Sequence, residues 1–193
     1  MHRTRIATLL LGAWLGGCLF MDMVATENFR SVDRMLTTPT AQMKERIQTL
    51  GGHDAARVLL RYQASEQNRQ YFAAWESIQI GLGLLLILVL VVAGQRDRVT
   101  LWLAGLMLGV ALLMHFLLTP EITRLGRAMD FGPVGRPSGE NTRFWIFHSV
   151  YSALELVKLG WGVALGLWLV LPRKKPQTAA TEPVPATSNG ASR

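Results

Sequence analysis

Four side chains that could support acid–base or metal chemistry stand near the ends of four apolar segments, one in each segment. Asp22 lies near the end of the first segment, and Glu76 opens the second. His115 lies one turn before the end of the third, and His148 lies just inside the start of the fourth. In an antiparallel bundle all four fall at about one depth, in the leaflet from which the two long connecting loops emerge. Charged groups inside a membrane normally face the bundle interior or water, so the sequence predicts a polar site there.

Imidazole and carboxylate groups could together bind a metal ion, and two histidines could bind a haem iron from both sides. The spacings HxxxH, HxxE and CxxCH are absent from the sequence, so depth alone supports a ligand set. The alternative is that each group hydrogen-bonds a neighbour and fixes the rotation of its helix. Of these alternatives, we favour the one in which the protein binds no cofactor. Two histidines that titrate near neutral pH would make the site pH-sensitive.

The fourth apolar segment also carries a polar face. With about 100° per residue, it places four side chains within an arc of about 120° beside His148. They are Tyr151, Ser152, Glu155 and Lys158. Glu155 and Lys158 are close enough along a helix to form an ion pair, which neutralises two charges that would each be costly alone. This face either holds the helices together or forms part of a path for protons or ions.

The hydropathy pattern predicts an all-α fold, an integral membrane four-helix bundle with a helical extramembrane loop between spans one and two. Each apolar segment has about the 20 residues needed to cross a hydrocarbon core of about 30 Å. The expected parts are a basic N-terminus with transmembrane helix one (1–25), an outer helical loop (26–70), transmembrane helix two (71–94), an inner link (95–98), transmembrane helix three (99–119), an outer loop (120–144), transmembrane helix four (145–171) and a disordered cytoplasmic tail (172–193).

The first loop carries its own helix signals. Asn28–Leu36 has apolar residues on one helical face and predicts a short helix on the membrane surface. Thr40 is expected to cap a second helix, Ala41–Leu50, which Gly51–Gly52 terminates.

Two further boundaries follow from caps and prolines. Asp54 is expected to cap a third helix, which either continues through the second span to Gly94 or bends near Gln70. Pro120 is expected to end the third span, because proline disfavours helix in the residue before it. The polar stretch Glu121–Arg143 then predicts a loop with an irregular centre rich in glycine and proline.

Charge and cysteine content narrow the class of protein. The net charge of +7 does not indicate a nucleic-acid partner, because the basic residues are spread over loops and membrane flanks, where they meet lipid headgroups. Basic residues close to the spans favour a bacterial inner membrane protein with both termini in the cytoplasm. Cys18 is the only cysteine, so no intrachain disulfide can form. The apolar run continues past Cys18 to Ala25, which favours an uncleaved helix over a lipid-modified cysteine.

The first and last spans carry motifs of small, aromatic and polar residues: Leu10, Gly12, Trp14, Gly16, Gly17, Phe20 and Asp22, and then Phe144, Phe147, His148, Tyr151, Ser152, Leu154, Leu156, Lys158 and Leu159. With Thr119-Pro120-Glu121-Ile122 they resemble the TMEM205-like family of small four-span membrane proteins. The resemblance implies a four-helix membrane protein, favours transport or metal handling, and assigns no catalytic residue. The long first loop departs from that family.

Three functions remain as hypotheses. The first is binding or passage of a metal ion or proton at an outward-facing site formed by Asp22, Glu76, His115 and His148. The second is a non-catalytic accessory subunit or assembly factor, whose outer helices dock a membrane protein partner or a second copy. The third is a haem-bearing electron carrier that uses both histidines. No nucleophile, zinc-protease, phosphate-loop or dinucleotide motif occurs, so an enzyme is not expected.

Overall fold

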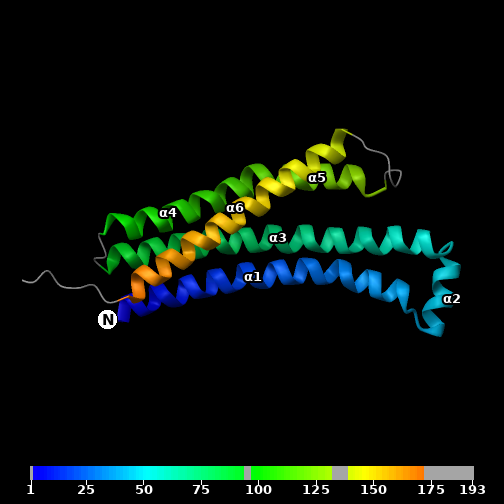
Figure 1. Cartoon of the computed structure of the whole chain (residues 1–193), viewed down its shortest axis with the longest axis horizontal. Helices are drawn as coiled ribbons and strands as arrows, with labels where there is room; N and C mark the ends of the chain where they lie inside the picture. Colours follow the sequence, from blue (N-terminus) through cyan, green and yellow to red (C-terminus); the bar gives the residue numbers. More distant parts are fainter. Residues whose placement is uncertain (1, 94–96, 132–138, 172–193) are drawn as a thin grey trace, which may run out of the picture.

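The computed structural model describes residues 2–93, 97–131 and 139–171, and all the regular structure in these residues is helical. Four helical stretches are long and apolar enough to cross a membrane, which confirms the predicted fold class: Thr4–Thr37, His53–Val92, Arg98–Met129 and Asn141–Val170. The elements in chain order are α1 (His2–Thr37), α2 (Ala41–Thr49), α3 (His53–Val92), α4 (Arg98–Leu113), the π-helical turn η1 (Met114–Leu118), α5 (Thr119–Met129) and α6 (Gly139–Val170). Figure 1 shows the long helices lying side by side, with α2 across one end.

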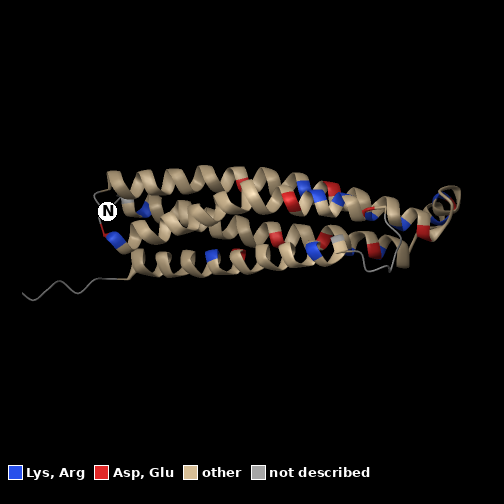
Figure 2. Cartoon of the chain, turned by 90° about the horizontal axis from the view of Figure 1, so that it is seen from above, with Lys and Arg blue, Asp and Glu red and all other residues tan. Residues whose placement is uncertain are grey.

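Helices α1 and α3 run together beyond the apolar part of the bundle to α2, and most of the charged residues lie in that half of the molecule (Figure 2). The prediction of a separate surface helix at Asn28–Leu36 is wrong, because α1 continues unbroken to Thr37. The predicted apolar face of this segment is real, but it packs within the protein. Val32 and Leu36 form a small core with Ile47 and two alanines of α3.

The predicted signals around α2 are confirmed. The Oγ1 atom of Thr40 accepts a hydrogen bond from the backbone N–H of Met43 at 3.3 Å. Gly51 and Gly52 have φ angles of 97° and 95°, in the left-handed region that glycine adopts most easily. Asp54 lies in the first turn of α3 rather than before it, since the helix begins at His53, two residues earlier than a cap at Asp54 requires.

Helix α3 is a single helix of 40 residues, so the continuous alternative for this region is confirmed and the bend near Gln70 is absent. The third span does not end at Pro120, which corrects the sequence prediction. The chain instead passes through η1, where the Thr119 N–H bonds to the Met114 carbonyl, and continues as α5 to Met129. Pro120 therefore sits in the first turn of α5, where a missing N–H is tolerated. Part of the predicted loop Glu121–Arg143 is thus helical, and its glycine- and proline-rich centre at 132–138 lies outside the described residues.

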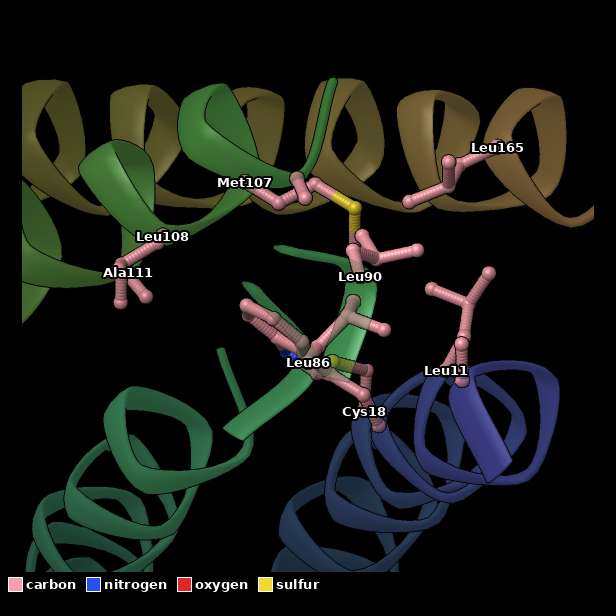
Figure 3. Packing of buried hydrophobic residues seen from close by; sticks show 11 residues of the cluster. Leu11, Cys18, Leu86, Leu90, Met107, Leu108, Ala111 and Leu165 are labelled. Atoms are coloured by element: carbon pink, nitrogen blue, oxygen red, sulfur yellow. The ribbon is translucent and has the colours of Figure 1, made fainter. Parts of the chain in front are cut away.

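The end of the bundle opposite α2 has an apolar core. Side chains from α1, α3, α4 and α6 meet there (Figure 3), including Leu11, Leu86, Leu90, Met107 and Leu165. Gly83 permits close packing at its edge, because a methyl group at that position would lie 2.9 Å from both Trp14 and Leu108. Gly12 and Gly16, whose spacing also suits close helix approach, have no atom within 4 Å of such a methyl group.

Candidate functional site

Glu76 of α3 is the centre of a polar cluster inside the bundle. Glu76 is only 1% exposed. The carboxylate accepts a hydrogen bond from the Tyr151 hydroxyl of α6 at 3.0 Å and another from the Thr119 hydroxyl of α5. The Nδ1 atom of His115 in η1 lies 3.2 Å from its Oε2 atom. One buried carboxylate therefore joins side chains from three other elements of the bundle.

The π-helical turn positions two of these partners. His115 lies within η1, and Thr119 directly follows it, so both come from the segment where the hydrogen-bond register changes. Single π-helical turns inside α-helices frequently occur at functional sites. The His115 side chain is 27% exposed, whereas that of Glu76 is 1% exposed. His115 is thus a partly exposed partner of the buried carboxylate, and Thr119 and Tyr151 are partly exposed too.

A second polar cluster lies one turn along α3 from Glu76. The Oε1 atom of Gln79 accepts hydrogen bonds from Trp14 Nε1 at 2.9 Å and from Lys158 Nζ. Lys158 also donates to Glu155 Oε2 at 2.7 Å, as the sequence predicts for this pair. Lys158 is 1% exposed, so its ammonium group lies inside the protein and not at a membrane surface. Helices α1, α3 and α6 all contribute to this cluster.

The two buried clusters contain two carboxyl groups and two basic groups. The Glu155 carboxylate pairs with the Lys158 ammonium group, and the Glu76 carboxylate contacts the His115 imidazole. Asp22 is exposed, so its charge is not part of this buried set. With Lys158 charged and His115 neutral, the two ionised carboxylates leave one negative charge uncompensated. An interior of low polarity disfavours such an excess, which a bound proton or cation would remove.

The structure brings together only part of the predicted site. Glu76 and His115 are in contact, but Asp22 and His148 lie on exposed faces of α1 and α6. The His148 ring stacks on Phe144 of its own helix. Over residues 2–93, 97–131 and 139–171, no group of three or more His, Cys, Asp or Glu side chains is arranged to hold a metal ion.

The polar face predicted for the fourth span divides in the same way. Tyr151, Glu155 and Lys158 point into the bundle, while Ser152 is exposed and its hydroxyl donates to the His148 carbonyl. Sequence reasoning missed Thr119 as a hydrogen-bond partner of Glu76, because Pro120 indicated that the helix ends at Thr119. The hydrogen bond from the Trp14 N–H to Gln79 was also missed, because no signal in the sequence indicates it.

Outside the membrane-spanning segments, α3 and α5 are tied together by ion pairs. Glu66 accepts from Arg127 at 3.0 Å and from Arg69 at 2.6 Å, and Arg69 also pairs with Asp130 at 2.8 Å. The hydrogen bond from Arg127, with that from Arg69, lowers the pKa of Glu66 from 4.5 to about 2. This network joins the outer part of α5 to α3.

Comparison with known proteins gives one match. A family model described as a domain of unknown function (DUF4149) matches residues 9–130. The chain has no match among curated proteins and none among solved structures. The matched stretch includes Glu76, Gln79, His115 and Thr119, whereas Tyr151, Glu155 and Lys158 lie beyond it in α6.

Proposed function

We propose that this chain, which belongs to the DUF4149 family of domains of unknown function, is a non-enzymatic membrane protein that binds protons at Glu76. The observation that carries the proposal is the buried Glu76 carboxylate, which contacts a partly exposed imidazole. A carboxyl group and an imidazole in contact can exchange a proton, and the exposed edge of His115 makes the pair accessible at the surface of the bundle. Protonation of Glu76 would also reduce the excess of negative charge in the bundle.

A proton suits this site better than a metal ion or haem. The Glu76 Oε1 atom already accepts hydrogen bonds from the Thr119 and Tyr151 hydroxyl groups, and a metal ion at that oxygen would have to displace them. Of the four predicted ligands, only Glu76 and His115 are in contact. The haem hypothesis requires His115 and His148 to face one iron, but one ring contacts Glu76 and the other stacks on Phe144.

Binding is better supported than passage across the membrane. The polar clusters occupy the part of the bundle nearer α2, and beyond Gln79 the core is apolar. The side chains of Leu86, Leu90 and Leu165 are all 0% exposed in that core. A proton that passes inward from Glu76 therefore meets the Gln79–Lys158 cluster and then this apolar core before the opposite surface.

The test is an infrared pH titration of the purified protein in lipid nanodiscs. We expect a protonated-carboxyl stretching band that grows as pH falls and that is missing in E76Q. The matched control is E121Q, which changes an acid near the surface and should leave the band in place. A titration identical in wild type and E76Q would refute proton binding at Glu76. Sustained proton flux in proteoliposomes would instead contradict the one-sided site.

The location proposed for the protein is a bacterial inner membrane with both termini in the cytoplasm and α2 outside. The basic residues adjoining the spans support this orientation. We also propose a relationship to the TMEM205-like family, on the motifs in the first and last spans. The orientation is tested by labelling single cysteines in α2 with a membrane-impermeant thiol reagent in whole cells. Cysteines that the reagent does not label would place α2 in the cytoplasm and overturn the proposed orientation.

The second candidate is an accessory subunit or assembly factor that docks a partner through the outer helices. It is favoured by exposed apolar side chains beside α2: Leu50 is 51% exposed, Leu59 49% and Val58 37%. Charge substitutions at Leu50 and Leu59 would then abolish copurification of a stoichiometric partner and leave the Glu76 titration unchanged. Such point variants are preferable to deleting the loop, because α1 and α3 pass into it without a break.

A further inference from the structure

Helices α1 and α6 are in contact at the apolar end of the bundle. A methyl group placed on Gly166 would lie 3.6 Å from Leu11, and one placed on Gly162 would overlap Leu15. At its other end α6 packs on α5, where a methyl group on Gly126 would lie 3.5 Å from Phe144. Figure 1 shows this diagonal course of α6 from α5 toward the start of α1.

Asp22 and His148 lie on the sides of α1 and α6 that touch at the apolar end. His148 precedes Gly166 by about five helical turns, and Asp22 follows Leu15 by about two, so each lies in line with a contact residue. At this level, however, α6 has moved toward α5. Asp22, His148 and Ser152 are accordingly exposed. The two helix sides that pack together at the apolar end of the bundle are thus exposed nearer α2, and they carry polar groups there.

The two side chains also share one depth. His148 is one turn before Tyr151, which bonds to Glu76, and so lies about 4.5 Å further out along the bundle. Asp22 lies one turn before Ala25, whose carbonyl accepts from Asn68 of α3. Trp75 covers Gly17, so Asp22 stands between the levels of Trp75 and Asn68 and about one turn outside Glu76. An acid and a base therefore occupy the same level on facing sides of two helices.

We propose that a second copy of this chain covers these sides, with Asp22 of each copy opposite His148 of the other. A two-fold axis along the membrane normal makes every contact in an interface occur twice, with residue i against j and j against i. An acidic α1 side and a basic α6 side satisfy this rule, since the axis brings unlike groups together. A carboxylate exposed to lipid is unfavourable, and a pairing base offsets that cost. The proposal concerns a different surface from the Glu76 site and does not depend on it.

The test is disulfide formation between differently tagged chains that are coexpressed in native membranes, in a C18S background. One chain carries D22C and the other H148C, so a disulfide between the two tags reports an intermolecular contact. One Asp22–His148 pair survives in that heterodimer. The matched control combines M23C and I146C, whose native side chains are 61% and 58% exposed on neighbouring positions of the same helices. We expect the mixed disulfide for the first combination and not for the control.

A second measurement uses no cysteine. Wild-type protein in nanodiscs should have the mass of two chains, and D22H should weaken dimerisation about tenfold by placing two histidines opposite each other, equivalent to about 1.4 kcal/mol. The charge swap D22H with H148D should restore it. A monomeric wild type, equal cross-linking of both cysteine combinations, or a single copy bound to lipid or to another protein at this surface would overturn the proposal.

Discussion

The two halves of the bundle core are built from different interactions. In the half toward α2, Glu76, Gln79, Glu155 and Lys158 join the helices by hydrogen bonds and an ion pair. In the opposite half the same helices meet mainly through apolar side chains, most of them leucine, methionine and alanine. The central residues of the two halves are buried to the same extent. Glu76 and Lys158 are 1% exposed, and Leu86 and Leu90 are 0% exposed.

The two halves are therefore stabilised by different interactions and contribute differently to the fold. Apolar side chains in a membrane gain little by leaving lipid, so the apolar half depends on close van der Waals packing around small residues. The polar half fixes which helix faces which, because its hydrogen bonds join specific donors and acceptors on different helices. It also holds ionisable groups that a purely structural core does not need. The contrast predicts that the two halves respond to substitution by different mechanisms.

The largest expected effect comes from leaving one charge alone in the polar half. Lys158→Met keeps the length of the side chain but removes the ammonium group that pairs with Glu155 at 2.7 Å. Breaking a buried pair from one side costs about 3–5 kcal/mol, and we expect a loss of that order in unfolding free energy, measured by titration with sodium dodecyl sulfate.

The matched variant removes both charges. Lys158→Met with Glu155→Met should recover most of the lost stability, because no uncompensated charge remains. If the double variant is as unstable as the single one, then the polar half is held by the geometry of these side chains and not by charge balance, and the contrast with the apolar half weakens.

In the apolar half the expected mechanism is overpacking. Gly83→Val would place methyl groups against Trp14 and Leu108, because the Cβ atom alone would already lie 2.9 Å from both side chains. Overpacking of a filled core costs about 1–3 kcal/mol, to be measured by the same detergent titration. Gly12→Val is the control, because that position is open, and its stability should stay near that of wild type. Equal effects at both glycines would contradict the packing described for this half.

Smaller effects are expected when a neutral donor is removed from the polar half. Tyr151→Phe and Thr119→Val each delete one hydroxyl that donates to Glu76 and change little else. Hydrogen bonds between membrane helices contribute about 0.6 kcal/mol on average, and each variant should lose about that much in the detergent titration. A loss as large as that of Lys158→Met would mean that Glu76 acts as an obligatory structural centre and not as an exchangeable proton site.

The spans could be predicted from sequence because hydropathy over about 20 residues is a strong signal. Glycine and threonine signals around α2 were equally local and equally reliable, as Thr40 and Gly51 show. Helix continuity was not predictable in the same way. Whether Val32 and Leu36 rest on lipid or on α3 depends on a partner more than 10 residues away, and the helix through Pro120 depends on a π-helical turn that no local motif marks.

Of the candidate site, the depth of each group could be read from the sequence but its direction could not. Glu76 and His115 turn toward each other, while His148 at a similar level turns outward, because α6 crosses the bundle at an angle. The Glu155–Lys158 pair was predictable since both residues lie on one helix. The contacts of Gln79 with Trp14 and of Glu76 with Thr119 join different helices, and their rotation about the helix axes is set by tertiary packing alone.

The smallest expected effect lies outside both halves, at the ion pairs that tie α3 to α5. The folded-state pKa of Glu66 is lowered to about 2 from 4.5, so its contribution to stability is complete above pH 4.5 and is lost as pH falls through about 2. Wild type should therefore lose thermal stability over that interval, by about 0.5 kcal/mol or less, because the pair is near the surface. Glu66→Gln should already be destabilised at pH 7 and show a weaker dependence on pH below 4.5. Glu27→Gln is the control, because Glu27 pairs with Arg34 within α1. If Glu66→Gln also altered the infrared titration of Glu76, the outer ion pairs would be coupled to the buried site through α5; an unchanged titration would show that the π-helical turn holds Thr119 and His115 in place without them.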